Sequence, residues 1–232
     1  MSRRRGRRLV ARIAIVVGVG IVALVVLAQL LAPGIAARVV RGKVEKYGTV
    51  RSVQVKAWPA VKLAWRRADE VRVSAGKLKL EPEQAVGLLK EAKGTDRVEA
   101  SVESVEVGGL RLTDARLEKH GDKLRAEGVA SEEDVKRALP EGLGVALVKS
   151  EGGTVEVRAS GGLFGVGASV DAVAQAEDGK LVARPTGLLL SRLKLTLFES
   201  ASVYVEGVEA RALASGPGGE ARYELSMWAS LR

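Results

Sequence analysis

Few side chains in this sequence could carry out proton transfer or bind a metal. The chain has no cysteine, which excludes disulfides, thiolate metal sites and cysteine nucleophiles. Its one histidine, His120, lies in a Lys-His-Gly-Asp turn and has no second histidine with which to share a metal ion. Carboxylates at residues 69–70 and 132–134 could act as acid and base, but a strand edge and a helix start account for them better. We therefore expect a protein that is not an enzyme and has no cofactor or metal.

One segment combines large aromatic rings with positive charge. Its apolar members, spaced as on a helix, are Trp58, Val61 and Trp65. Beside them are three cations, Lys62, Arg66 and Arg67. Tryptophan and basic residues together favour a bilayer interface with anionic headgroups, so we expect the apolar members to contact lipid and the cations to face headgroups at the membrane surface. The alternative is that both rings pack in the core and the cations are ordinary solvated side chains.

The N-terminal region indicates export from the cytoplasm. Residues 13–32 carry no charge, and a helix of this length, about 30 Å, matches the hydrocarbon core of a bilayer. Residues 1–32 contain six arginines and no acidic residue, which predicts a cytoplasmic N-terminus. We predict a basic cytoplasmic tail at 1–12, a transmembrane signal-anchor at 13–32 and an extracytoplasmic domain at 33–232, held at the plasma membrane in a single pass. A cleaved signal peptide is the alternative.

The net charge of +9 is largely a property of that N-terminal region. The remaining 200 residues contain 31 basic and 28 acidic side chains, which is close to balance. A nucleic-acid surface needs basic residues clustered on the folded domain, so we expect no nucleic-acid partner.

Three helices are predicted in the exported region, which we take as one continuous domain. Apolar residues recur at helical spacing between residues 35 and 47, between 85 and 92, and between 135 and 139. Pro82 and Gly94 bound the second helix, and Ser131 with the acidic residues after it starts the third. Most of the remainder alternates apolar and polar residues, as in antiparallel strands with one dry face.

The alternation changes parity at several points. It does so at Gly76, between Val102 and Val105, and after Leu112. A bulge inside one strand would produce such a change, and so would a strand boundary; we favour a bulge or bend at Gly76. Because bulges bend a sheet, the predicted fold class is α+β: a long, curved antiparallel sheet wrapped on two or three helices.

Aliphatic residues are expected to form a lipid-contacting surface, because aromatic residues are only 3% of the chain. The most apolar stretch after the N-terminal segment supplies Leu188, Leu190, Leu193, Leu195 and Leu197. The second predicted helix supplies Leu88 and Leu89. A wall of small aliphatic side chains suits an acyl chain, and an ordinary core strand is the alternative for the leucine-rich stretch.

Several segments in this order resemble the LmeA-type phospholipid-binding family of actinobacterial envelopes. They are an N-terminal apolar segment followed by a helix, the Trp58-Pro59 step, the strand segments 69–73 and 98–107, the helix start at 130–135, and Asp178-Gly179. The resemblance implies a long curved sheet on helices, a lipid-holding groove of the tubular-lipid-binding type and a role in envelope glycolipid maturation. It supplies no catalytic residues.

Two functions follow from these observations. The first is binding or transfer of phospholipid by a membrane-anchored extracytoplasmic protein that holds acyl chains in an apolar groove. The alternative is a membrane-tethered scaffold of the cell envelope, with a filled core, no ligand cavity and another envelope protein as its partner.

Overall fold

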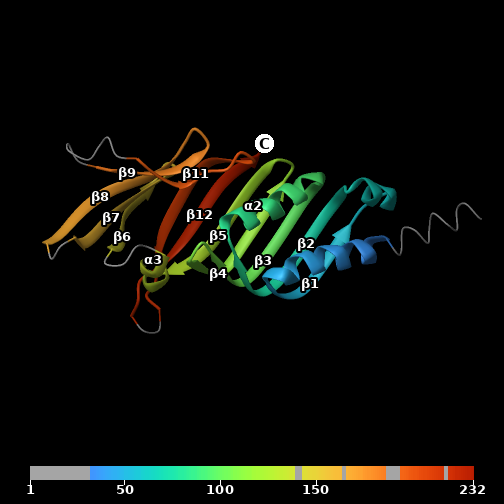
Figure 1. Cartoon of the computed structure of the whole chain (residues 1–232), viewed down its shortest axis with the longest axis horizontal. Helices are drawn as coiled ribbons and strands as arrows, with labels where there is room; N and C mark the ends of the chain where they lie inside the picture. The colour runs from blue at the N-terminus through green and yellow to red at the C-terminus, as the bar shows by residue number, and fades with distance from the viewer. Residues whose placement is uncertain (1–31, 139–142, 164–165, 187–193, 217–218) are drawn as a thin grey trace, which may run out of the picture.

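Two β-sheets form an elongated molecule (Figure 1). The computed structural model describes residues 32–138, 143–163, 166–186, 194–216 and 219–232. The seven-stranded sheet contains, in spatial order, β1 (Gly48–Lys56), β2 (Ala68–Leu80), β3 (Thr95–Val107), β4 (Leu110–His120), β5 (Lys123–Ser131), β12 (Arg222–Leu231) and β11 (Val203–Leu213). The five-stranded sheet contains β10 (Leu195–Phe198), β9 (Lys180–Pro185), β8 (Val166–Glu177), β7 (Thr154–Leu163) and β6 (Leu143–Glu151).

The three predicted helices are confirmed. A helix covers residues 32–44 and continues into the 3₁₀ turn η1 (Glu45–Tyr47); the others are α2 (Pro82–Glu91), followed by η3 (Ala92–Gly94), and α3 (Glu132–Ala138). Local signals explain the starts of the last two. Pro82 occupies the first turn of α2, and the backbone N–H of Glu81 donates to the side-chain oxygen of Gln84 at 2.9 Å. Ser131 Oγ accepts the backbone N–H of Asp134 at 3.1 Å and so caps α3.

The expectation of an antiparallel sheet is wrong for one pair of strands. β2 and β3 run parallel, and α2 is the crossover that connects them. Parallel neighbours need a long connection, whereas two-residue turns suffice for antiparallel hairpins such as β4–β5. The strands also divide between two sheets instead of forming one.

The predicted curvature is confirmed, and the parity changes lie inside continuous strands. Relative to β1, strand β2 has one extra residue between Ala75 and Leu78; relative to β5, strand β4 has one extra residue between Thr113 and Arg116. Strand β3 lies between β2 and β4 and pairs with each of them without a register shift. The parity of its inward-facing positions therefore changes at the same level. Asp114 in β4 adopts a φ of 52°, which lets the chain bulge there. These aligned irregularities bend the sheet at one level.

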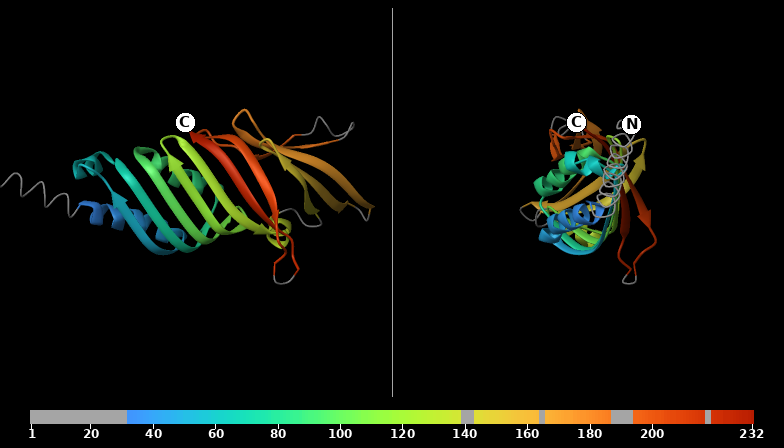
Figure 2. Two further views of the ribbon diagram at one scale, coloured as in Figure 1. Left: turned by 180° about the vertical axis from the view of Figure 1, so that it is seen from behind. Right: turned by 90° about the vertical axis from the view of Figure 1, so that its right-hand side faces the viewer.

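Helices cover one face of the seven-stranded sheet, which we call the inner face. Val44 of the first helix packs with buried residues of β1 to β4, and Leu88 of α2 packs against the same cluster. Leu89 packs against a second cluster that contains Leu124 and Ala229. Viewed along the long axis, the strands curve around the helices (Figure 2). The inner face is therefore concave, and its curve is filled in part by the chain's own helices.

The edge strand β11 joins the two sheets. Its residues Val205, Val208 and Ala210 form a buried cluster with Val155 of β7. Its backbone N–H groups also find acceptors in turns of the five-stranded sheet: Val205 N donates to the Gly179 oxygen at 2.9 Å, and Val208 N donates to the Gly153 oxygen at 3.4 Å. The edge of the larger sheet is thus covered by the smaller one.

The predicted membrane segment lies almost wholly outside the described residues, since only Ala32 of residues 13–32 is described. Among the helices that the structure describes, none is both long enough and apolar enough to cross a bilayer.

Candidate functional site

An apolar row crosses the inner face of the seven-stranded sheet from strand to strand. Strand register places its members side by side on β1, β2, β3, β4, β5 and β12: Val53, Val73, Ala100, Leu117, Ala126 and Met227. Each of these side chains remains partly exposed. We call these six residues the inner row. It runs along the long axis of the molecule because it crosses the strands.

Helix α2 is fixed on both sides of the inner row. Leu88 packs in the cluster that contains Ala75 and Ala115, which are the next inward-facing residues on one side of the row. Leu89 packs in the cluster that contains Leu124 and Ala229, which are the next inward-facing residues on the other side of the row. The predicted lipid-contacting residues Leu88 and Leu89 therefore border a strip of apolar side chains that the helix leaves partly uncovered.

Two hollows on the described surface are open to solvent. One, of about 350 Å³, extends over β1 to β4. Its lining combines polar residues such as Arg72, Glu99 and Arg116 with Val73, Ala100 and Leu117 of the inner row. The other, of about 280 Å³, lies on the five-stranded sheet beside Lys149 and Glu151. Both are open to solvent and contain charged or polar lining residues, so neither is an enclosed apolar tunnel.

The remaining predicted lipid-contacting leucines are not brought to the inner row. Leu195 and Leu197 lie on β10, an edge strand of the other sheet, with 63% and 50% of their surface exposed. Leu188, Leu190 and Leu193 fall outside the described residues. Phe198, the neighbour of Leu197, turns inward instead and packs at the junction of the two sheets.

The tryptophan segment forms a projecting loop around η2 (Ala60–Trp65). Trp58 and Trp65 are 73% and 69% exposed, and Val61 is 54% exposed, so the alternative that both rings pack in the core is wrong. Only Ala60 of η2 is buried. The apolar side chains that sequence spacing grouped together are thus presented to the outside of the molecule.

A carboxylate holds this loop against β2. Asp69 accepts the Lys62 ammonium at 2.7 Å on one oxygen and the backbone N–H of Trp58 on the other. The Lys62 hydrogen bond, followed by that of Trp58, lowers the pKa of Asp69 below its ordinary value. Lys62 therefore has a structural partner, unlike a cation held free for headgroups.

The other two predicted surface cations are fully available. Arg66 and Arg67 are exposed, and among the described residues no carboxylate lies within ion-pair distance of either. Arg66 has a left-handed φ of 56°, and its carbonyl oxygen would lie 2.5 Å from a Cβ at Gly94. The glycine thus lets the end of η3 approach the loop at Arg66.

Lys119 is a cation that the sequence did not single out. It follows Leu117 on the inner face of β4, only 2% of it is exposed, and its ammonium donates to the Thr95 carbonyl. Burial lowers the pKa of Lys119, although Asp96 and Asp122 act in the opposite direction. The signal in the sequence that Lys119 faces inward was its place in the alternating apolar pattern of the strand, two residues after Leu117.

The carboxylates that could have formed an acid–base pair are engaged in ion pairs. Glu70 bonds Lys56 at 2.9 Å, Glu132 lies 2.6 Å from Lys136, and Glu133 lies 2.8 Å from Arg137. The His120 ring contacts the Arg97 guanidinium. Within the described ranges no group of acidic or histidine side chains has the geometry of a metal site.

An open, curved sheet with an apolar inner strip defines a protein class suited to holding an apolar ligand along its surface. The family model described as LmeA-like phospholipid-binding matches residues 22–218, and the chain belongs to this family. The family resemblance predicted from the sequence is confirmed, and lipid binding is the property that the family supplies. No curated protein and no solved structure matches the chain.

Proposed function

We propose that this protein is a membrane-anchored, extracytoplasmic phospholipid carrier that holds an acyl chain along the inner row. Residues 13–32 anchor it in the plasma membrane, and the transfer of lipid supports glycolipid maturation in the envelope. The partly exposed row of apolar side chains between the two anchoring leucines of α2 is the observation that carries this proposal. Membership of a phospholipid-binding family supports it.

The dimensions of the inner row suit an acyl chain. Six neighbouring strands span about 24 Å at the usual interstrand spacing of about 4.8 Å. One acyl chain covers about 15 Å, half of the bilayer's hydrocarbon thickness. Burying a dozen methylenes contributes roughly 10 kcal/mol before ordering costs, at about 0.8 kcal/mol each. The row is long enough for a whole chain, and no catalytic group is required.

Photocrosslinking in cells tests this proposal on the full-length chain. The photoreactive residue p-benzoylphenylalanine replaces either Ala100, in the inner row, or its neighbour Ser101, on the outer face of the same strand. Cells grown with radioactive phosphate should yield a labelled phospholipid adduct from the Ala100 position and far less from the Ser101 position. Both positions lie at the same distance along the molecule, so equal labelling, or none at Ala100, contradicts an acyl chain on the inner row.

A scaffold function has one observation in its favour. Leu195, Leu197 and Val148 are exposed apolar side chains on the five-stranded sheet, away from the inner row. The same photoreactive residue in place of Leu197 would yield a stoichiometric protein adduct if an envelope protein binds there. A protein adduct at Leu197 together with no lipid adduct at Ala100 would favour the scaffold over the carrier.

A further inference from the structure

Exposed apolar side chains gather at one end of the molecule. The first helix and the η2 loop both lie at this end, as both side views show (Figures 1 and 2). Together they contribute most of the large apolar side chains that are exposed in the described residues: Ile35, Val39, Trp58, Val61 and Trp65. We call these five residues the tip. Exposed apolar side chains gathered at one end in this way are typical of a contact site.

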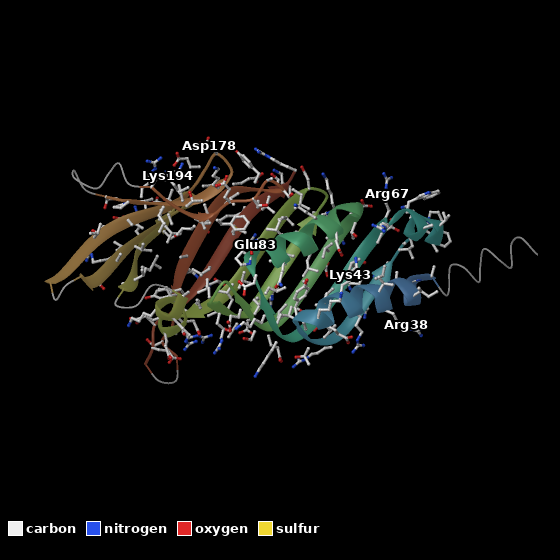
Figure 3. The ribbon with its side chains drawn as sticks, in the orientation of Figure 1. Arg38, Lys43, Arg67, Glu83, Asp178 and Lys194 are labelled. Carbon is white, nitrogen blue, oxygen red and sulfur yellow. The ribbon has the colours of Figure 1, made fainter. Side chains whose placement is uncertain are left out.

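Cations surround the tip. Arg38 lies on the first helix and Arg67 beyond η2, at the same end of the molecule (Figure 3). Arg66 is exposed as well, and in the described part of the chain no acidic side chain forms an ion pair with Arg38, Arg66 or Arg67. Asp69, at the start of β2, already forms an ion pair with Lys62. The tip is therefore apolar with a net positive border, which complements an anionic lipid surface.

The chain outside the described residues also points to a bilayer. In the sequence, the uncharged segment 13–32 ends where the first helix, residues 32–44, begins. That beginning lies at the same end as η2 (Figure 1). A bilayer that holds residues 13–32 would thus be adjacent to the tip rather than to the five-stranded sheet.

We propose that the tip docks end-on against an anionic phospholipid bilayer. Trp58 and Trp65 lie in the interface, Arg38, Arg66 and Arg67 contact lipid phosphates, and the five-stranded sheet is the part farthest from the membrane. The β1 end of the inner row then faces the bilayer, because the row runs along the long axis. This docking concerns the tip alone and holds whether or not the inner row binds lipid.

The three tryptophans of the chain provide the test. The full-length protein is reconstituted into phosphatidylglycerol-containing vesicles whose acyl chains carry bromine, which quenches nearby tryptophan emission. Trp228 is the internal control, because it lies on the outer face of β12 beside Arg125, in the middle of the molecule. Brominated lipid should quench most of the wild-type emission and leave the emission of the Trp58→Phe/Trp65→Phe double variant nearly unchanged.

The other outcomes overturn the proposal. Equal quenching of Trp228 means that the molecule lies on its side, and no quenching of the wild type means that the tip points away from the bilayer. A second copy covering the tip would give unquenched tryptophans and a crosslinked dimer. Because quenching reports on the tip and the Ala100 adduct reports on the inner row, either proposal can fail without the other.

Charge variants test the role of the cations. Arg66→Gln/Arg67→Gln should reduce quenching on anionic vesicles and have little effect on neutral phosphatidylcholine vesicles. The matched control is Lys77→Gln/Lys90→Gln, which removes two exposed cations of β2 and α2 that form no ion pair among the described residues. Equal loss of quenching in both double variants means that the overall charge of the protein, and not the tip, determines its attraction to the anionic bilayer. That result would contradict the role assigned to Arg66 and Arg67.

Discussion

The two sheets of this protein differ in what covers their apolar faces. In the seven-stranded sheet, the crossover α2 and the first helix pack on the inner face. In the five-stranded sheet, two of the connections are two-residue turns, Gly152-Gly153 and Asp178-Gly179, and these leave no chain to lie over the strands. Its apolar face packs against β11 near Val155, while Val145, Ala159 and Val170 farther along stay partly exposed. The connection between two parallel strands is long enough to contain a helix that covers the sheet, whereas a two-residue hairpin turn is not.

The largest expected difference between the sheets concerns single leucines. Leu80, at the end of β2, is buried in the cluster under the helices, so Leu80→Ala should lower the free energy of unfolding by about 2–5 kcal/mol through lost burial and a cavity. Leu195 of the five-stranded sheet is mostly exposed, and Leu195→Ala should change it by less than about 0.5 kcal/mol. Urea unfolding in mild detergent, followed by circular dichroism, measures both. Similar values would remove the distinction between a covered and an uncovered sheet.

The junction of the sheets should be sensitive to a single methyl group. A Cβ at Gly179 would overlap the Tyr204 ring, and the φ of Gly179 is +78°. Gly179→Ala should therefore cost about 3 kcal/mol from backbone strain and overpacking. Gly152 has a comparable φ of +62° and open space, so Gly152→Ala should cost only about 1 kcal/mol. Thermal unfolding compares the two, and equal costs would show that the contact with Tyr204 contributes nothing.

Helix α3 touches both sheets through β4, β5 and β6. Ser131→Ala removes the hydroxyl that caps this helix and should cost about 1 kcal/mol. Hydrogen exchange should show faster exchange in α3 and in β6, since the helix contacts that edge strand. Ser101→Ala, on the exposed outer face of β3, is the control. Faster exchange confined to α3 would mean that the helix does not support the smaller sheet.

The smallest effect concerns pH. Because the pKa of Lys119 is lowered in the folded state, the unfolded chain binds more protons between that pKa and the ordinary lysine value. Stability should therefore rise with pH over this alkaline interval, and Lys119→Met should flatten the rise. The control in the other sheet is Lys180→Met, which removes a lysine paired with Glu199. Unfolding free energies at several alkaline pH values measure the slopes; an unchanged slope in Lys119→Met contradicts the assignment.

Local signals made parts of the fold predictable. Pro82 and Gly94 bound the α2–η3 unit, and Ser131 starts α3, because each acts within one turn of its own helix. The change of parity at Gly76 predicted a bulge correctly, since a strand must keep its dry face toward the core. The parallel pairing of β2 with β3 carried no such signal, because it depends on where α2 brings the chain back.

The candidate site was predictable only in part. The grouping of Trp58, Val61 and Trp65 came from spacing, but whether the rings point inward or outward depended on Asp69 and on the packing of the loop. Leu88 and Leu89 were placed on one helix, yet the inner row beside them joins six strands from distant parts of the sequence. The lipid-contacting and headgroup roles remain predictions.

The sequence by itself determined the family, the helices, the alternating strands and the bend, because these follow from chemistry within a few neighbouring residues or from an ordered set of motifs. Tertiary structure alone decided the division into two sheets, the parallel pairing of β2 with β3 and the inner row. Each of these results from contacts between residues far apart in the chain. The free energy of such contacts depends on which strands become neighbours, and no local pattern encodes that choice.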